Sequence, residues 1–251
     1  MSRGISEKEQ RWLLVLSQVI EVLDKNNLLY FIDTGTLLGA VRDKMFIPWD
    51  NDIDLAVIGG DTSTTNLLKV SKLLYALGFY VTLTKKEIAI CSRDGVNLGI
   101  KLYKKQASHY EACMGKVYRH RLFYSINLYL SGEVLYKKGF SFKYKAISLF
   151  VKFSQVFKLK LSCIWQMKLL FWAKYDEKTV IIPFEFVDAI IDYNFYNIIV
   201  KVPNKPERYL AYRYGENWKV PKQDYDYMID DKSIINICLL YTSDAADELD
   251  G

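Results

Sequence analysis

The sequence has few of the residues that build zinc clusters or disulfide frameworks. It contains only two His and four Cys, and the Cys at positions 91, 113, 163 and 238 form no Cys-x-x-Cys pair. We therefore expect neither a zinc site nor a disulfide scaffold. Unpaired thiols are typical of a reducing compartment, which favours a cytoplasmic protein.

Long apolar runs are also missing. Charged residues at positions 7, 8, 9 and 11 interrupt the segment that a signal peptide would need to keep apolar. No uncharged apolar stretch reaches the ~18 residues that a membrane-spanning helix requires. We therefore expect no secretory leader and no spanning helix, and any membrane contact is expected to be peripheral.

The composition is that of a folded domain. Hydrophobic residues make up 51% and charged residues 25% of the 251 positions, which excludes a disordered chain. The net charge of +5 fits anionic partners such as phosphates without identifying one.

Helical and strand periodicities alternate along the chain. Apolar residues at spacings of three and four predict an amphipathic helix over 7–25. Asp94-Gly95 is a tight-turn signal and predicts an antiparallel pair. The other predicted elements are a short strand or start of a helix at 28–32, strands at 53–58, 79–83, 87–92, 96–103 and 193–202, and helices from Ser63 to about Leu77 and from Pro206 to Gly215.

Two segments stand apart by composition. Residues 141–175 are basic, aromatic and helical in pattern, and either pack on the core, which we favour, or lie on an anionic membrane surface. Residues 238–247, CLLYTSDAAD, are encoded by a DNA string that resembles a transposase adapter used in sequencing libraries. We interpret residues 238–251 as an adapter-derived tail; the other reading is an ordinary acidic tail.

The sharpest signal is the acidic strand that follows Pro48. Asp52 and Asp54 are two residues apart, so they point to one side, ~6.6 Å apart along the strand, while Ile53 and Leu55 face the core. Two such carboxylates repel each other unless a cation lies between them, and Mg²⁺ or Mn²⁺ suits oxygen ligands. A solvated acidic loop or an acidic helix start are the plainer readings. A calcium loop counted from Asp50 lacks its required Gly and Glu, and is excluded.

A Thr-Gly-Thr turn precedes this strand. Thr34-Gly35-Thr36 leads into an apolar run, which predicts a loop feeding a helix N-terminus with Thr34 as a competent cap. Free backbone N–H groups at Gly35 and Thr36 suit a phosphate. A Gly-Ser/Thr pair, a helix and then an acidic strand is the order found in nucleotidyltransferase folds.

Residues 33–55, DTGTLLGAVRDKMFIPWDNDIDL, closely resemble the signature of the LicD/fukutin family. A second segment, from Val202-Pro203 through Tyr214-Gly215-Glu216-Asn217-Trp218 to Pro221, resembles its closing motif. The resemblance implies an α+β nucleotidyltransferase (polymerase-β-like) fold over 1–237, with a mixed sheet flanked by helices and a helical insertion. Aromatic residues of the closing motif, such as Tyr209, either stack on a base or sugar or close the core.

The resemblance also implies an activity. Members transfer phosphocholine, ribitol phosphate or similar groups from CDP-linked donors to glycans, so the implied partners are a CDP-linked alcohol and a glycan or lipid-linked glycan, with no nucleic acid. The residues implied are Asp52 and Asp54 as catalytic metal ligands, Gly35 and Thr36 next to the donor phosphate, Arg42 and Lys44 against the diphosphate or on a solvated helix face, and Asp50 in support.

One departure leaves other functions open. Members often carry a third acid on a later strand, but Asn97–Tyr103 has none, and Asp94 and Glu111 are the remaining candidates for that ligand and for a general base. A nucleotidyltransferase that moves NMP to RNA, protein or a small molecule is a second reading, which the Ile-Pro-Trp context disfavours. A non-catalytic glycan- or partner-binding protein is a third.

Overall fold

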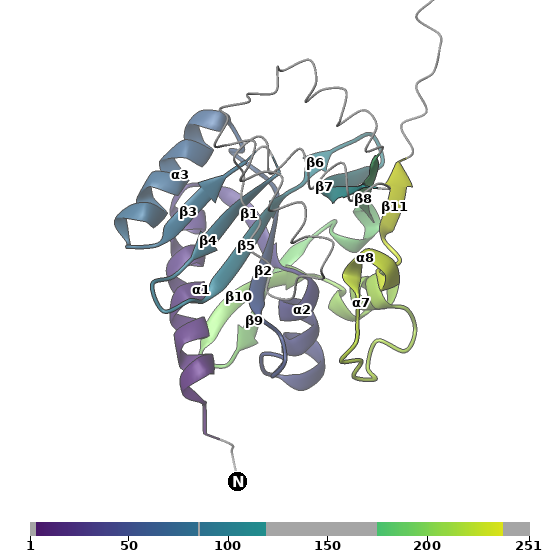
Figure 1. Ribbon diagram of the computed structural model, residues 1–251, viewed down its shortest axis with the longest axis horizontal. Helices are drawn as coiled ribbons and strands as arrows, with labels where there is room; N and C mark the ends of the chain where they lie inside the picture. The colour runs from purple at the N-terminus through teal and green to yellow at the C-terminus, as the bar shows by residue number, and fades with distance from the viewer. Residues whose placement is uncertain (1–3, 85, 119–174, 238–251) are drawn as a thin grey trace, which may run out of the picture. The chain divides into compact units, whose positions relative to one another are not determined.

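The computed structural model describes residues 4–84, 86–118 and 175–237 (Figure 1). The chain divides into two compact units, Met1–Cys113 with Thr179–Ile235 and Met114–Lys178 with Asn236–Gly251. The first unit carries every residue of the candidate site described below. Most of the predicted helical segment 141–175 and all of the tail 238–251 lie outside the described residues, and Tyr175 belongs to a strand.

A five-stranded mixed sheet is the centre of the first unit. Its strand order is β1-β2-β5-β4-β3, with β2 and β5 parallel and the other neighbours antiparallel. Ile53 and Leu55 of β2 are fully buried. The strands are β1 (Leu28–Ile32), β2 (Asp52–Gly60), β3 (Tyr80–Leu83), β4 (Glu87–Cys91) and β5 (Asn97–Leu102).

Two amphipathic helices pack on this sheet and on each other (Figure 1). Helix α1 (Glu7–Lys25) begins with a capping box between Ser6 and Glu9 and ends at Asn26, as its periodicity predicts. Helix α3 (Thr64–Ala76) begins at the predicted cap, Ser63. The helices, the mixed sheet and the β4–β5 turn thus confirm an α+β architecture.

The Thr-Gly-Thr turn opens a helix, but its cap differs from the prediction. Helix α2 (Thr34–Leu38) is capped by Asp33, whose carboxylate accepts from the Thr34 N–H, and Thr34 is already the first helical residue. A carboxylate cap is favoured because it faces the positive end of the helix dipole. The helix continues through a π-helical turn, η1 (Gly39–Asp43), and ends at Lys44.

The C-terminal part adds elements that the sequence did not predict. In place of one strand over 193–202, a hairpin forms from β9 (Ile190–Phe195) and β10 (Ile198–Pro203). Helix α7 (Pro206–Tyr214) ends at Gly215 as predicted. The remaining elements are η2 (Phe184–Phe186), α8 (Tyr227–Asp230) and a sheet ordered β11-β8-β7-β6, made of β6 (Lys104–Lys105), β7 (His109–Tyr118), β8 (Tyr175–Pro183) and β11 (Ile234–Ile237).

In the part of the chain that the structure describes, no helix is both long and apolar enough to cross a membrane.

Candidate active site

The two acids of β2 lie at the beginning of the strand, on the face opposite Ile53 and Leu55. Asp52 is exposed and Asp54 is half-buried, whereas Ile53 between them is fully buried. Burial raises the pKa of Asp54 to about 7, with the charge of Asp52 adding to the shift and Lys101 opposing it. The pair therefore concentrates negative charge that its surroundings only partly offset.

The first turn of α2 is bonded directly to Asp54. The Thr34 hydroxyl donates to the Asp54 carboxylate, and the Asp54 N–H donates to Thr36 Oγ1 over 2.9 Å. The Asp33 N–H also donates to the Asp54 carbonyl over 3.0 Å. Thr34 has a φ of +42°, which is rare for a β-branched residue and stores strain. These bonds fix the position of Asp54 relative to the start of α2.

Gly35 is required because a carboxylate lies against it. A Cβ at this position would come within 2.2 Å of Asp50 Oδ2. Burial raises the pKa of Asp50 to about 6, and the neighbouring Asp52 raises it further against the N–H of Asn51. Lys8 holds the preceding loop by donating to the Asp50 carbonyl over 2.8 Å. Asp50 is thus a third carboxylate beside the predicted phosphate turn.

The two predicted phosphate-binding cations have other partners. Arg42 donates two hydrogen bonds to Asp43, at 2.9 and 2.7 Å, and its side chain is 7% exposed. Lys44 Nζ donates to the Tyr193 hydroxyl over 2.6 Å. No hydrogen bond or ion pair joins either side chain to Asp52 or Asp54 among the described residues, so their role at a donor diphosphate stays a prediction.

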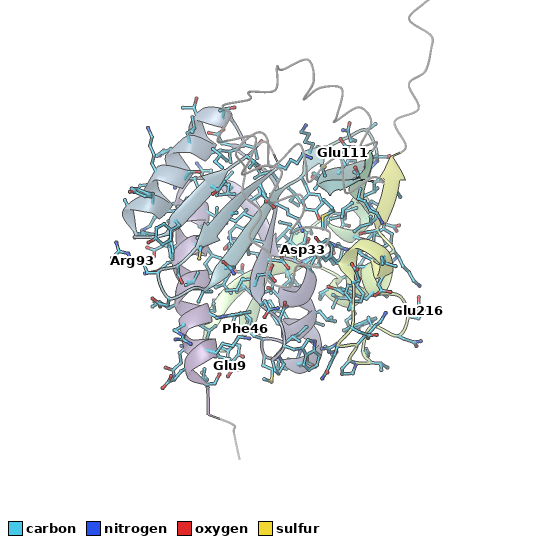
Figure 2. The ribbon with its side chains drawn as sticks, in the orientation of Figure 1. Glu9, Asp33, Phe46, Arg93, Glu111 and Glu216 are labelled. Atoms are coloured by element: carbon cyan, nitrogen blue, oxygen red, sulfur yellow. The ribbon has the colours of Figure 1, made fainter. Side chains whose placement is uncertain are left out.

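The candidates for a third acid lie elsewhere on the first unit. Asp94 is exposed in the turn before β5. Glu111, labelled in Figure 2, accepts from Gln106 Nε2 over 2.5 Å on β7. Over the described ranges, no group of three or more His, Cys, Asp or Glu side chains is arranged to hold a metal ion. The oxygen donors and raised pKa values at the start of β2 nevertheless fit a hard divalent cation, which takes further oxygens from phosphate and water.

A buried ionic network behind the turn was missed by sequence reasoning. Asp33, labelled in Figure 2, accepts from Arg213 Nη1 at 3.0 and 3.1 Å, from the Tyr209 hydroxyl at 2.7 Å and from the Tyr103 hydroxyl at 3.2 Å. Arg213 also pairs with Asp231 at 2.6 Å, and all three charged side chains are at most 2% exposed. Tyr209 of the closing motif therefore closes the core.

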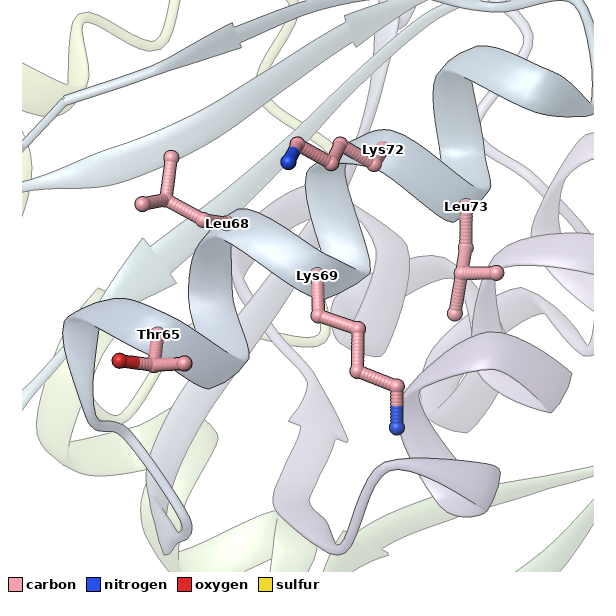
Figure 3. A pocket seen from close by; sticks show the side chains of 5 residues that line it. All are labelled: Thr65, Leu68, Lys69, Lys72 and Leu73. Carbon is pink, nitrogen blue, oxygen red and sulfur yellow. The ribbon is translucent and has the colours of Figure 1, made fainter.

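A surface hollow on α3 lies apart from these residues. It is lined by one helix alone, and its lining includes no carboxylate, thiol or imidazole (Figure 3). Its lining residues are Thr65, Leu68, Lys69, Lys72 and Leu73. The hollow shares no residue with the acidic strand or the α2 turn, so we assign it no part in the site.

A known protein family matches the part of the chain that carries this site. Residues 27–147 match the model of the family described as "LicD/FKTN/FKRP, nucleotidyltransferase domain". The match includes the acidic strand and the Thr-Gly-Thr turn, and it confirms the resemblance seen in the sequence. Residues 27–147 are therefore similar to the nucleotidyltransferase domain of the LicD/FKTN/FKRP family.

Two curated relatives match part of the chain. An uncharacterized protein of Rickettsia prowazekii (strain Madrid E) is 33% identical over 110 residues, which is 43% of this chain and 40% of that protein. An uncharacterized protein of Rickettsia typhi (strain ATCC VR-144 / Wilmington) is 31% identical over 126 residues, which is 50% of this chain and 39% of that protein. The matches span about two fifths of the length of these relatives.

Among solved structures, the crystal structure of ANT(2")-Ia in complex with adenylyl-2"-tobramycin is 15% identical. The alignment covers 62% of this chain and 93% of that one, with a TM-score of 0.31. At this TM-score the similarity supports no inference about fold or function.

Proposed function

We propose that this protein transfers a phospho-alcohol, such as phosphocholine or ribitol phosphate, from a CDP-linked donor to a glycan in cell-surface polysaccharide or glycoconjugate biosynthesis. The observation that carries the proposal is the bonding of Asp54 to the Thr-Gly-Thr turn, beside Asp52. The match of residues 27–147 to the LicD/FKTN/FKRP family supports a phosphotransferase acting on glycans. The same arrangement supports a nucleotidyltransferase (polymerase-β-like) fold.

In this proposal Asp52 and Asp54 hold Mg²⁺ or Mn²⁺. Once bound, the ion offsets negative charge on the donor pyrophosphate and aligns its oxygens for displacement. Thr34 and Thr36 hold Asp54 at its carboxylate and at its backbone, so that the ligand is oriented before the ion and donor arrive. Asp50 adds negative charge beside them.

The acceptor in this proposal is a glycan, free or lipid-linked, and the reaction takes place in the cytoplasm or at a membrane surface. In this proposal the phosphorus of the bound donor lies between Asp52 and the start of α2, where an acceptor hydroxyl reaches it. No general base is assigned, and a loose phosphoryl-transfer transition state needs positioning and charge stabilisation more than proton abstraction.

Product analysis tests the proposal. Purified protein is incubated with Mg²⁺, a glycan acceptor and either CDP-choline, CDP-ribitol or the four NTPs, and CMP and pyrophosphate are measured. The expected result is CMP from a CDP-alcohol, abolished by EDTA and by Asp52→Asn or Asp54→Asn. Pyrophosphate from an NTP would show an NMP transferase instead, and tight glycan binding without turnover of any donor would show a binding protein.

A further inference from the structure

The face of the sheet that carries Asp54 also carries a lysine. In the parallel pairing of β2 with β5, Asp54 lies opposite Gly99 and Ala56 lies opposite Lys101. Side chains two apart on a strand share a face, so Lys101 projects on the same side as Asp54, one pair further along. Strand β5, where a third acid was expected, thus places a lysine near the acids.

Small residues lie between Asp54 and Lys101 on this face of the sheet. Gly99 has no side chain, and a Cβ there would already lie 3.8 Å from Asp54 Oδ1. Ala56 is its neighbour on β2, and Ala89 of β4 lies opposite Gly99 on the other side. These three positions thus place little or no side chain between Asp54 and Lys101 on this face of the sheet.

Lys101 forms no hydrogen bond or ion pair among the described residues. It is half-buried, and its charge acts on Asp54 without a direct contact. The ring centroid of Tyr227 lies 5.9 Å from Lys101 Nζ. Glu87 lies directly across from Lys101 in the β4–β5 register, yet the two form no ion pair. An ammonium held in this way is suited to an anionic ligand.

Tyr227 supplies an aromatic surface next to the lysine. It stands at the start of α8 and remains 49% exposed. An exposed aromatic ring beside a cation is the combination that binds the base and the phosphate of a nucleotide, because every base offers a flat face for stacking.

We propose that Lys101 and Tyr227 form the nucleotide subsite of this protein, in which Lys101 binds a phosphate of a nucleoside diphosphate and Tyr227 stacks on its base, above the small residues Ala56, Ala89 and Gly99. The subsite deepens the proposed function and rests on it for the identity of the donor. It assigns the positive charge opposite the acids to β5 rather than to Arg42 or Lys44.

Calorimetric titration of the full chain with CDP in the presence of Mg²⁺ tests the subsite. Lys101→Gln is expected to weaken CDP binding about tenfold or more, because a charge-assisted contact to phosphate is lost, and Lys101→Arg is expected to retain most of the affinity. Tyr227→Leu is expected to weaken it about tenfold, whereas Tyr227→Phe keeps the ring and binds as wild type does. Lys72→Gln, on the exposed face of α3 (Figure 3), is the matched control and leaves the affinity unchanged.

Thermal unfolding of each variant shows whether it remains folded. Folded Lys101→Gln and Tyr227→Leu proteins that bind CDP as tightly as wild type would overturn the subsite, and so would a wild-type protein that binds none of CDP, UDP, ADP or GDP. Binding of a nucleoside diphosphate through both residues, without transfer from any CDP-alcohol, would support the subsite and refute the proposed function. Transfer from a CDP-alcohol with KM unchanged in both variants would support the proposed function and refute the subsite.

Discussion

Replacing Arg213 with Met removes the one cation that two buried carboxylates share. Asp33 and Asp231 both pair with its guanidinium at 1–2% exposure, so the variant leaves two negative charges in the core without their counter-charge. Breaking a buried ion pair by removing one partner costs about 3–5 kcal/mol. That is a large fraction of the ~5–15 kcal/mol by which a domain is stable. We therefore expect Arg213→Met to lose about 3–5 kcal/mol in urea unfolding at pH 7.5.

Arg208→Met is the matched control on the same helix. Arg208 is 59% exposed and lies 3.6 Å from the exposed Glu185, so its loss is expected to cost less than about 1 kcal/mol. If Arg213→Met unfolds at the same urea concentration as Arg208→Met, the network does not stabilise the fold as described.

The loss should also depend on pH. Burial alone would raise the pKa of Asp33, but Arg213 and the bonds from Tyr209 and Thr34 hold it below its ordinary value. A lowered folded pKa adds stability that is complete above the unfolded pKa, near ~3.9, and is lost as the pH falls below it. Without Arg213 the same burial raises the pKa of Asp33. Protonation of Asp33 at lower pH then removes its buried charge and restores part of the variant's stability. The difference in free energy of unfolding between wild type and Arg213→Met should therefore become smaller from pH 7.5 to pH 5. A difference that becomes larger would refute this reasoning.

Three substitutions at the turn test the positioning of Asp54. Gly35→Ala should displace the Asp50 carboxylate, which lies 2.2 Å from the new Cβ, and should lower transfer from a CDP-alcohol at least about tenfold in initial-rate assays; Gly35→Ala with Asp50→Gly should recover part of it. Thr36→Val leaves the Asp54 N–H without its acceptor and should lower the free energy of unfolding in urea by about 1–3 kcal/mol. A loss below about 0.5 kcal/mol, which is the effect of an ordinary surface substitution, would count against this hydrogen bond. Thr34→Ser should keep turnover because it keeps the hydroxyl, and Thr34→Val should lose it; equal rates for the two would show that the hydroxyl does not orient the carboxylate.

Local patterns predicted the parts of the fold that local forces decide. Helix α1 follows from its apolar period, and the β4–β5 pair follows from Asp94-Gly95. The β9–β10 hairpin was missed because Tyr196-Asn197 carries no Gly or Pro signal, although Tyr196 takes a positive φ of 53°.

The site was predictable only where its residues are adjacent in sequence. Asp52 and Asp54 could be assigned to one face because a strand alternates. The partners of Asp33 and Arg213 are set by tertiary packing across 180 positions, and no spacing rule reaches that far. Lys101 was passed over for a related reason, since only the β2–β5 register places it beside Asp54.

Divalent-ion binding at the paired acids is the most direct test of the account. Titration of folded wild-type protein with Mg²⁺ or Mn²⁺ in the presence of CDP should show uptake of the ion, and the Asp52→Asn, Asp54→Asn double variant should bind it at least about tenfold more weakly. Equal uptake by the two proteins would contradict the assignment of these acids as the metal ligands.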